Sequence, residues 1–366
     1  MRLDFFPSRR LTTYLAKTFV VRIAAVLVML VVVLQALDLL SQTGNILAQP
    51  GNGQAEVLQY VSLRAPQLVA RFLPYSVLLA TIITLATLNA NSEVIAMKAA
   101  GLSAHQILAP LVLTAGVISA ISFTFNETVV TRASAKLQAW DAVDFGPIPT
   151  DEKARTNAYF TSDDDILMAR LVSGEGDDIT LSGVTFYERG QGGAIVRQFR
   201  ADRATYANPG WALEQPTRFD VGPALSVETP ETFIVAERLT PAQIMLGKID
   251  PDATPAGELS DHIDALDAAG RRTAELKGAW WHKFSGPLSA LLMPILGAVA
   301  AFGLARSGQL FVRAVIGMAL GFAYFVVDNA ALAMGNFGGY PPLLAAWAPF
   351  VLFALIGEAV LIRTEE

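Results

Sequence analysis

The stretch Asn89–Ile107, NANSEVIAMKAAGLSAHQI, is a short polar segment between two long apolar runs. Ser92 or Asn91 is a suitable N-cap, because the side-chain oxygens of Ser and Asn accept a hydrogen bond from a first-turn N–H. Gly101 suits the position just past a helix end, where a positive φ is common. The pattern predicts a helix over 92–101, about two and a half turns long, which is too short to cross a membrane.

This predicted helix has two possible roles. Glu93 lies in the first turn, where the helix dipole favours an acid, and Val94, Met97 and Ile95 give the helix an apolar side. One interpretation is an interfacial helix that seals a tight connection. The other is a docking site for a cytoplasmic partner, with Glu93 pairing with an arginine of the partner and Met97 as an adaptable apolar contact.

The composition of the whole chain indicates a membrane protein. Of 366 residues, 53% are hydrophobic and 16% are charged, and the mean hydropathy is +0.43. That is too apolar for a soluble globular protein of this length, so we expect a polytopic membrane protein. The chain contains no cysteine, which excludes a disulfide framework, a thiolate metal site and a cysteine nucleophile.

Six runs are long and apolar enough to form membrane-spanning helices, which need about 20 residues each. They lie at about 14–40, 66–88, 102–125, 284–305, 311–333 and 342–362. The first run is too long for the apolar region of a signal peptide, so we expect it to be retained as a helix. The runs define an N-terminal membrane half, 1–135, and a C-terminal membrane half, 279–366.

Basic residues in the short flanking segments predict the orientation. With an even number of spans both termini lie on one side, together with the loops at 89–101 and 305–313. That side collects Arg2, Arg9, Arg10, Lys17, Lys98, Arg306, Arg313 and Arg363. The opposite short loops, 43–62 and 335–341, contain no lysine or arginine. The positive-inside rule therefore predicts cytoplasmic termini.

The polar middle of the chain, 136–278, is expected on the outer side. From Asp141 to Lys283 there are 24 acidic and 14 basic residues, against 9 and 13 in the rest of the chain. Short β-type runs such as ITLSGVTFYERG and AIVRQFRADRATYAN alternate with turn residues, which predicts an all-β sandwich or jelly-roll-like domain. The segment LSDHIDALDAAGRRTAEL then has helical periodicity and leads back to the membrane.

The layout resembles a known family. Three spans, an outward β domain and three further spans, with NSEVIAMKAAGLS as a coupling-helix segment, are similar to the LptF/LptG permeases of the lipopolysaccharide exporter. The C-terminal stretch GFAYFVVDNAALAMGNFGGYPPLLAAWAPF, with Asp328 in the fifth span and two prolines before the sixth, resembles the LptG branch. The resemblance covers essentially the whole chain.

The resemblance implies a function and a set of partners. It implies a permease subunit of an ABC exporter that extracts lipopolysaccharide from the bacterial inner membrane and passes it to a periplasmic bridge. The implied partners are an LptF-like permease, an LptB-like ATPase dimer, a single-span LptC-like protein and an LptA-like bridge. The β domain is then periplasmic. The implied coupling residues are Glu93, Val94, Met97, Lys98 and Gly101.

The resemblance also implies a substrate cavity. Related permeases can carry lysines near the end of the first span, where Gln35, Ser41 and Gln42 stand here and Asp38 is the only charged residue. Candidate cations for the head-group phosphates are Arg64, Arg71, Arg132 and Lys136. Further residues expected at the cavity or gate are Tyr324 and Asp328. The alternative for each cation is snorkelling to lipid head groups.

Other functions are weighed against transport. The chain lacks a G-x-x-x-x-G-K-[ST] motif, so ATP hydrolysis, with its magnesium, is expected in a partner, and we expect no cofactor on this chain. The three histidines lack ligand-type spacing, so no metal site is expected. One rival is a membrane-anchored scaffold with a periplasmic binding domain. A second is an intramembrane enzyme that uses Asp328 or His282, but no convergent acid–base set is evident. We expect no nucleic-acid partner.

Overall fold

The computed structural model describes most of the chain. The described residues are 7–141, 144–146, 155–162, 165–174, 178–190, 193–220, 227–228, 232–237, 239–241, 244, 249–268, 271–302 and 310–365. Contacts between residues divide the chain into two compact units. The first unit comprises Met1–Ser41, Gln59–Ser134 and Pro251–Glu366, and the second comprises Gln42–Leu58 and Ala135–Asp250.

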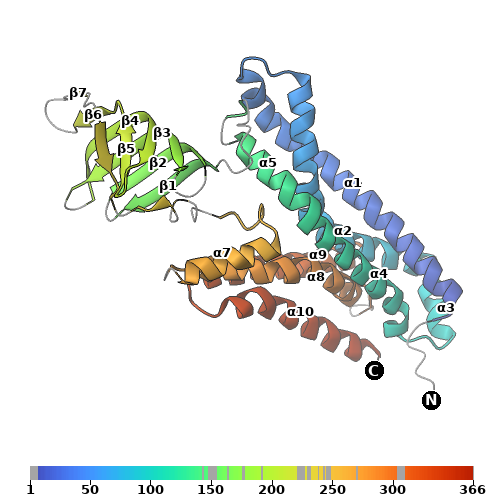
Figure 1. The fold of residues 1–366 in the computed structure, drawn as a ribbon. Coiled ribbons are helices and arrows are strands. Elements are labelled where there is room, and N and C mark those ends of the chain that lie inside the picture. Colours follow the sequence, from blue (N-terminus) through green and yellow to red (C-terminus); the bar gives the residue numbers. More distant parts are fainter. Residues whose placement is uncertain are drawn as a thin grey trace. The chain divides into compact units, whose positions relative to one another are not determined.

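The helices follow the order expected from the apolar runs (Figure 1). In the N-terminal half they are α1 (Arg9–Ala48), α2 (Gln54–Ala90), α3 (Glu93–Ala99), α4 (Ala104–Phe125), the π-helix η1 (Asn126–Val130) and α5 (Thr131–Asp141). After the sheet come α7 (Ala256–Ala268), α8 (Ala274–Phe302), α9 (Leu310–Asn336) and α10 (Pro342–Glu365).

Five helical stretches in the described part of the chain are long and apolar enough to cross a membrane. They are Arg9–Ala48, Gln54–Ala90, Ala104–Asp141, Val315–Asn336 and Pro342–Arg363. The fourth predicted span, 284–305, falls in the 29-residue helix α8, although 303–309, with Arg306, lie outside the described residues, as does Arg2. The predicted class of a helical membrane protein is confirmed.

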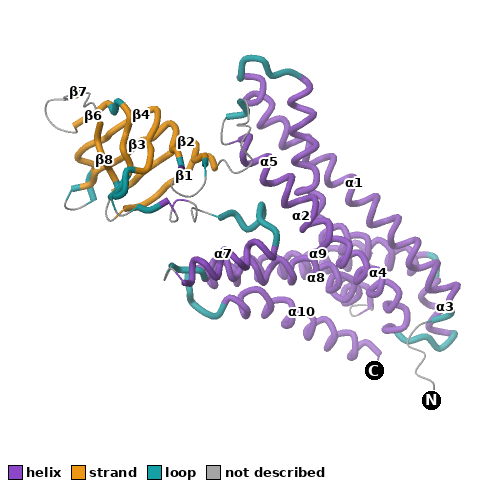
Figure 2. The backbone as a smooth tube through the Cα atoms, in the orientation of Figure 1, coloured by secondary structure: helices purple, strands orange, loops and turns teal. Residues whose placement is uncertain are grey.

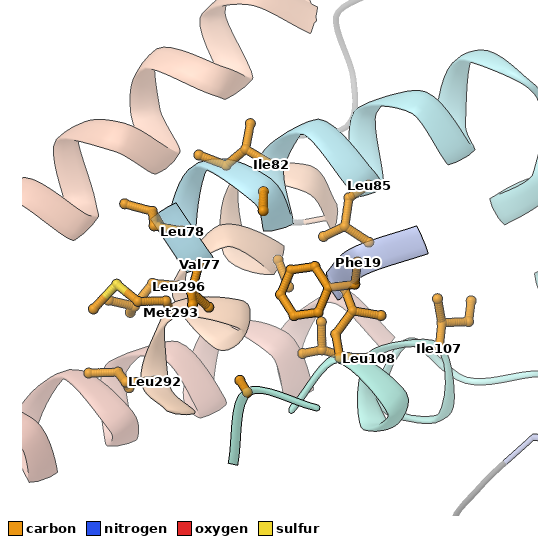
Figure 3. Packing of buried hydrophobic residues seen from close by; sticks show 14 of the residues in the cluster. Phe19, Val77, Leu78, Ile82, Leu85, Ile107, Leu108, Leu292, Met293 and Leu296 are labelled. Atoms are coloured by element: carbon orange, nitrogen blue, oxygen red, sulfur yellow. The ribbon is translucent and has the colours of Figure 1, made fainter. Parts of the chain in front are cut away.

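The core of the first unit lies where these helices meet. α8 packs against α4, α9 and α10, and α4 also contacts α3. Large apolar side chains fill the space between the helices (Figure 3). Labelled there are Phe19 of α1, Val77, Leu78, Ile82 and Leu85 of α2, Ile107 and Leu108 of α4, and Leu292, Met293 and Leu296 of α8. The helix ends on the side of α3 are therefore held by a shared apolar cluster.

Close approach of two helices depends on small residues. Gly335 of α9 faces Ala345 of α10, and a Cβ built on Gly335 falls 2.5 Å from the Cβ of Ala345. A Cβ on Gly321 of α9 would meet the flexible end of the Leu78 side chain of α2, which can move aside. Small residues permit such contacts between membrane helices, so Gly335 allows the close approach of α9 to α10.

The second unit contains one antiparallel sheet (Figure 2). Its strands are β1 (Arg155–Ser162), β2 (Asp165–Ser173), β3 (Thr180–Arg189), β4 (Ile195–Tyr206), β5 (Trp211–Glu214), β6 (Thr217–Asp220), β7 (Val227–Glu228) and β8 (Thr232–Val235). The order is β1-β2-β3-β4-β5-β8, and β6 pairs with β4 and β7. The long strand β4 therefore pairs with β5 over one part and with β6 over another. The predicted all-β insert is confirmed as an antiparallel sheet.

Aromatic side chains form much of the sheet's core. Phe186 of β3 lies opposite Phe199 of β4 in the register, and Phe199 stacks on Phe233 of β8 with ring centroids 4.5 Å apart. Trp211 of β5 is fully buried, and its indole Nε1 donates a hydrogen bond to the carbonyl oxygen of Leu239 at 2.8 Å. A buried indole N–H requires such an acceptor.

The unit that holds the sheet ends at Asp250. The predicted inserted domain, 136–278, includes a helical return segment. By contacts, α7 and the start of α8 group instead with the long helices. The reason is that α7 packs on α8 through buried side chains, which include Leu259, Ile263 and Leu266.

Candidate functional site

The candidate coupling helix α3 is fixed by its backbone at its C-terminal end. The N–H of Leu102 donates to the carbonyl of Met97, and the N–H of Gly101 donates to the carbonyl of Lys98. Together with a φ of +88° at Gly101, these bonds form a Schellman motif. The predicted place of Gly101 just past the helix end is confirmed, and a side chain at this position would strain the turn.

The two segments that flank α3 differ in how they are held. Ser92 is the N-cap, but with φ of 60° its side chain makes no capping hydrogen bond. Directly after α3, Ser103 and Gln106 form a capping box at the start of α4. The Ser103 hydroxyl accepts the Gln106 N–H at 3.2 Å, and the Gln106 amide oxygen accepts the Ser103 N–H at 3.1 Å. Such reciprocal caps fix the angle at which a helix begins.

The apolar side of α3 faces inward rather than outward. Val94 and Met97 are 4% and 8% exposed and belong to the apolar core of the first unit. Met97 was expected to contact a partner, and the structure corrects this, because its side chain packs on the chain's own helices. Ile95 is 66% exposed, and Lys98 is also exposed. The outward apolar contact of α3 is therefore Ile95.

Glu93 is held by groups from its own chain. The Tyr14 hydroxyl, from α1, lies 3.2 Å from Oε2 and 3.4 Å from Oε1 of Glu93. The Asn91 amide donates to Oε1 at 3.3 Å. Within the described residues Glu93 forms no ion pair. A carboxylate that is positioned but lacks a cation is a suitable acceptor for an arginine from another chain.

A second polar cluster links the far end of α1 to α2 and α5. Asp38 accepts hydrogen bonds from the Tyr60 hydroxyl at 2.6 Å and from Arg64 at 3.3 Å. Arg64 also donates to Gln67, whose amide donates to Ser134. Arg64 is one of the four cations predicted for the head-group phosphates, but Asp38 already neutralises it.

Gln35 and Ser41 lie one turn either side of Asp38 on α1. Gln35 is 7% exposed, and both polar atoms of its side-chain amide are without a hydrogen-bond partner among the described residues. The Ser41 hydroxyl instead donates to the carbonyl of Asp38 in its own helix. A buried amide is costly to leave without hydrogen bonds. Of these two residues, Gln35 would therefore gain more from a hydrogen bond to a bound group.

Three of the predicted cations carry no partner in the described part of the chain. Arg71 of α2 and Arg132 and Lys136 of α5 are exposed and form neither hydrogen bonds nor ion pairs there. Arg132 and Lys136 are four residues apart in α5, so they lie on one face of the helix.

Asp328 and Tyr324 of α9 are both buried. Asp328 is 4% exposed, its Oδ2 lies 3.8 Å from Nε2 of His282, and its Oδ1 has no hydrogen-bond partner among the described residues. Tyr324 is 1% exposed and packs edge-on against Phe353. A residue that lines a substrate cavity must be accessible. In this chain taken alone, neither Asp328 nor Tyr324 is.

His282, which the sequence offered with Asp328 for a rival enzyme function, lies between Ser285 and Asp328 in the structure. The Ser285 hydroxyl lies 3.2 Å from Nδ1 of His282, but the imidazole–carboxylate distance of 3.8 Å exceeds a hydrogen bond. Ser285 is 1% exposed and stands inside the regular helix α8 rather than on a sharp turn. The arrangement lacks the accessible nucleophile of a hydrolase.

Sequence reasoning also missed a pair near α3. His105 of α4 and Glu358 of α10 lie 2.9 Å apart. Their separation in the sequence, 253 residues, left no local signal. No group of three or more His, Asp or Glu that could hold a metal ion occurs among the residues that the structure describes.

The chain is similar to known permeases over nearly its full length. A family model described as "Lipopolysaccharide export system permease LptF/LptG" matches residues 13–363. The chain is 24% identical to the lipopolysaccharide export system permease protein LptG of Escherichia coli K12, with 98% of this chain and 99% of that protein aligned. It is 23% identical to LptG of Haemophilus influenzae, with 94% of this chain and 96% of that protein aligned.

Proposed function

Because this chain belongs to the family of lipopolysaccharide export system permeases LptF/LptG, we propose that it is the LptG-type subunit of an inner-membrane ABC exporter. In this proposal it extracts lipopolysaccharide from the membrane and passes it to a periplasmic bridge. The assignment to LptG rather than LptF is supported by the two relatives named LptG, which align over nearly their whole length.

The proposed orientation places both termini and α3 in the cytoplasm. The start of α4 and the end of α10 then lie on the same side. The excess of lysine and arginine in these segments supports it. The sheet then lies in the periplasm, where an acidic domain faces the next component of the bridge. The partners in this proposal are an LptF-like permease, an LptB-like ATPase dimer, a single-span LptC-like protein and an LptA-like bridge.

The observation that carries the proposed coupling is the structure of α3. Its C-terminal end is locked by the motif at Gly101, and its inner face is buried through Val94 and Met97. Ile95 and the carboxylate of Glu93 remain available on the other side. A helix fixed in this way transmits displacement to the neighbouring helices, because packed cores deform in discrete steps rather than continuously. Hydrolysis of ATP with magnesium takes place in the partner.

The proposed substrate path uses the exposed apolar face of α1 and the three unpaired cations. Val28, Met29, Val32 and Val33 of α1 are all more than half exposed, as expected for side chains that contact acyl chains or a second permease. Arg71, Arg132 and Lys136 supply positive charge for the phosphates, because guanidinium groups bind phosphate through two hydrogen bonds. Closure of the spans then removes apolar contact from the acyl chains and drives the lipid towards the periplasm.

The substitution Glu93→Lys tests this proposal. In proteoliposomes that contain the complete complex, the variant is expected to hydrolyse ATP without matching release of lipopolysaccharide, because the reversed charge repels a partner arginine. Asp264→Lys, a charge reversal at an exposed site beyond the first turn of α7, is the matched control and is expected to behave as the parent. Normal lipid release by Glu93→Lys would exclude Glu93 from coupling.

A further inference from the structure

A buried ion pair joins η1 to α8. Lys283 Nζ lies 3.2 Å from Oε1 of Glu127, and the two side chains are 7% and 16% exposed. Transfer of two charges out of water is unfavourable, so packing alone does not explain why charged residues occupy this place. A buried ion pair of this kind can favour one arrangement of the helices over others.

The second oxygen of Glu127 holds the start of α7. Oε2 accepts the backbone N–H of Ala256 at 2.6 Å. The first N–H groups of a helix lack partners within the helix, and they attract negative charge. On the other side, Trp280 Nε1 of α8 donates to the carbonyl of Ala256 at 2.9 Å. Both backbone polar groups of Ala256 are therefore bound, one by η1 and one by α8.

We call the cluster of these four residues the Glu127 clasp; they are Glu127, Ala256, Trp280 and Lys283. Its carboxylate stands in a five-residue π-helix that interrupts the otherwise continuous helix from Ala104 to Asp141. A π-turn holds one residue more than an α-turn and occurs mostly at functional sites. Loss of that extra residue would rotate the two halves of the helix by about 100° relative to each other.

The clasp connects parts of the chain that flank the sheet in sequence. Glu127 precedes strands β1 to β8 and Ala256 follows them. One carboxylate thus binds the helix that leads to the sheet and the helix that returns from it. All four residues belong to the first unit, which also contains the long apolar helices.

We propose that Glu127 and Lys283 are positioning residues for lipopolysaccharide transport. They hold α7 to the third and fourth spans, so that the segments before and after the sheet move together when these spans move. The inference rests on the proposed function, since the transport cycle supplies the movement. It assigns no contact with the lipid to either residue.

The isosteric substitution Glu127→Gln removes the charge and leaves Lys283 buried without a carboxylate. Loss of a charge-assisted hydrogen bond shifts a two-state equilibrium by about tenfold or more. We therefore expect lipid release per ATP hydrolysed to fall about tenfold, while the complex still assembles and hydrolyses ATP. Glu258→Gln, which neutralises an exposed acid in the first turn of α7, is the matched control and leaves release unchanged.

A distance measurement separates positioning from a merely structural effect. The chain has no cysteine, so spin labels at Thr124→Cys and Asp264→Cys are the only labels on it, and both sites are exposed. In the assembled complex we expect a narrow distance distribution for the parent and a broad one for Glu127→Gln and Lys283→Met. An unchanged distribution, or unchanged lipid release, would overturn the proposal.

The charge swap Glu127→Lys with Lys283→Glu provides a further test. It restores opposite charges but places an ammonium group against the N–H of Ala256, which it cannot bind. We expect the swapped protein to remain as defective as Glu127→Gln, and full recovery would contradict the role of Ala256. The distance measurement needs no ATP, so a failure of the proposed coupling at Glu93 is distinguishable from a failure of the clasp.

Discussion

The Tyr14 hydroxyl, near the start of α1, lies 3.2 Å from Oε2 of Glu93, the first residue of α3. This contact spans 79 residues of sequence and joins the first long helix to the candidate coupling helix. It leaves the carboxylate oriented while Tyr14 itself is 46% exposed. The relation between the two residues means that a group bound to Glu93 also acts on α1.

Tyr14→Phe is expected to weaken coupling without loss of the fold. The substitution removes one hydroxyl and keeps the ring, so Glu93 stays in place less firmly. A single exposed hydrogen bond corresponds to about a threefold effect, and we expect lipid release per ATP to fall by that amount in reconstituted complexes. Tyr340→Phe, which removes a hydroxyl bound to the carbonyl of Ala331, is the control. Equal release by parent and Tyr14→Phe would show that Glu93 needs no support from α1.

The face of α5 that carries Arg132 and Lys136 is expected to bind lipid phosphates. Neutralisation of both residues to glutamine should weaken binding of lipopolysaccharide by about tenfold or more, because each cation supplies charge-assisted hydrogen bonds. The effect should shrink at high salt, which screens exposed charges. Binding of fluorescent lipid to the purified complex provides the measurement. Arg10→Gln, on the proposed cytoplasmic side, should bind as the parent does; an equal loss there would indicate a non-specific charge effect.

Gly335→Ala is expected to destabilise the packing of α9 on α10. The added methyl group falls against Ala345, whose Cβ cannot rotate away. Overpacking of this kind costs about 1–3 kcal/mol, which thermal unfolding in detergent should detect as a lower midpoint. Gly257→Ala in α7 is the control, because a Cβ there meets nothing within 4 Å. A midpoint for Gly335→Ala equal to that of the parent would mean that the two helices lie further apart than described.

The corner between α7 and α8 is expected to weaken in acid. Hydrogen bonds from Lys277 and Thr273 hold the pKa of the Asp267 carboxyl below its ordinary value. A lowered pKa in the folded protein gives stability that is present above the unfolded pKa of about 4. This stability is lost as the pH falls through the pKa of the folded protein. Thermal unfolding at a series of pH values should therefore separate the parent from Asp267→Asn at neutral pH and bring them together in strong acid. A difference that persists at low pH would contradict this assignment.

Sequence reasoning predicted the features that depend on local chemistry. The length of each apolar run predicts a membrane-spanning helix, and the alternating runs of the insert predict strands. Gly101 predicts the end of α3, because glycine readily adopts the positive φ that the position after a helix requires. These patterns are contained within about 20 neighbouring residues. The resemblance then supplied the expected order of spans and sheet.

Features that depend on distant contacts could not be predicted. Met97 is a residue type that often contacts a partner. Only the packing of α3 on the other helices shows that its side chain points into the core. Arg64 has the appearance of a free cation until Asp38 of α1 is placed beside it. The Glu127–Lys283 pair joins residues 156 positions apart, and no local pattern links them.

The central claim is that this chain is a permease subunit that a partner ATPase drives. The most direct test is to tag the chain, extract it from its native membrane in mild detergent, and identify the proteins that co-purify by mass spectrometry. The account predicts a soluble ATPase and a second permease of the same family in stable association. Recovery of this chain alone, under conditions that preserve other membrane complexes, would contradict it and favour a membrane-anchored scaffold.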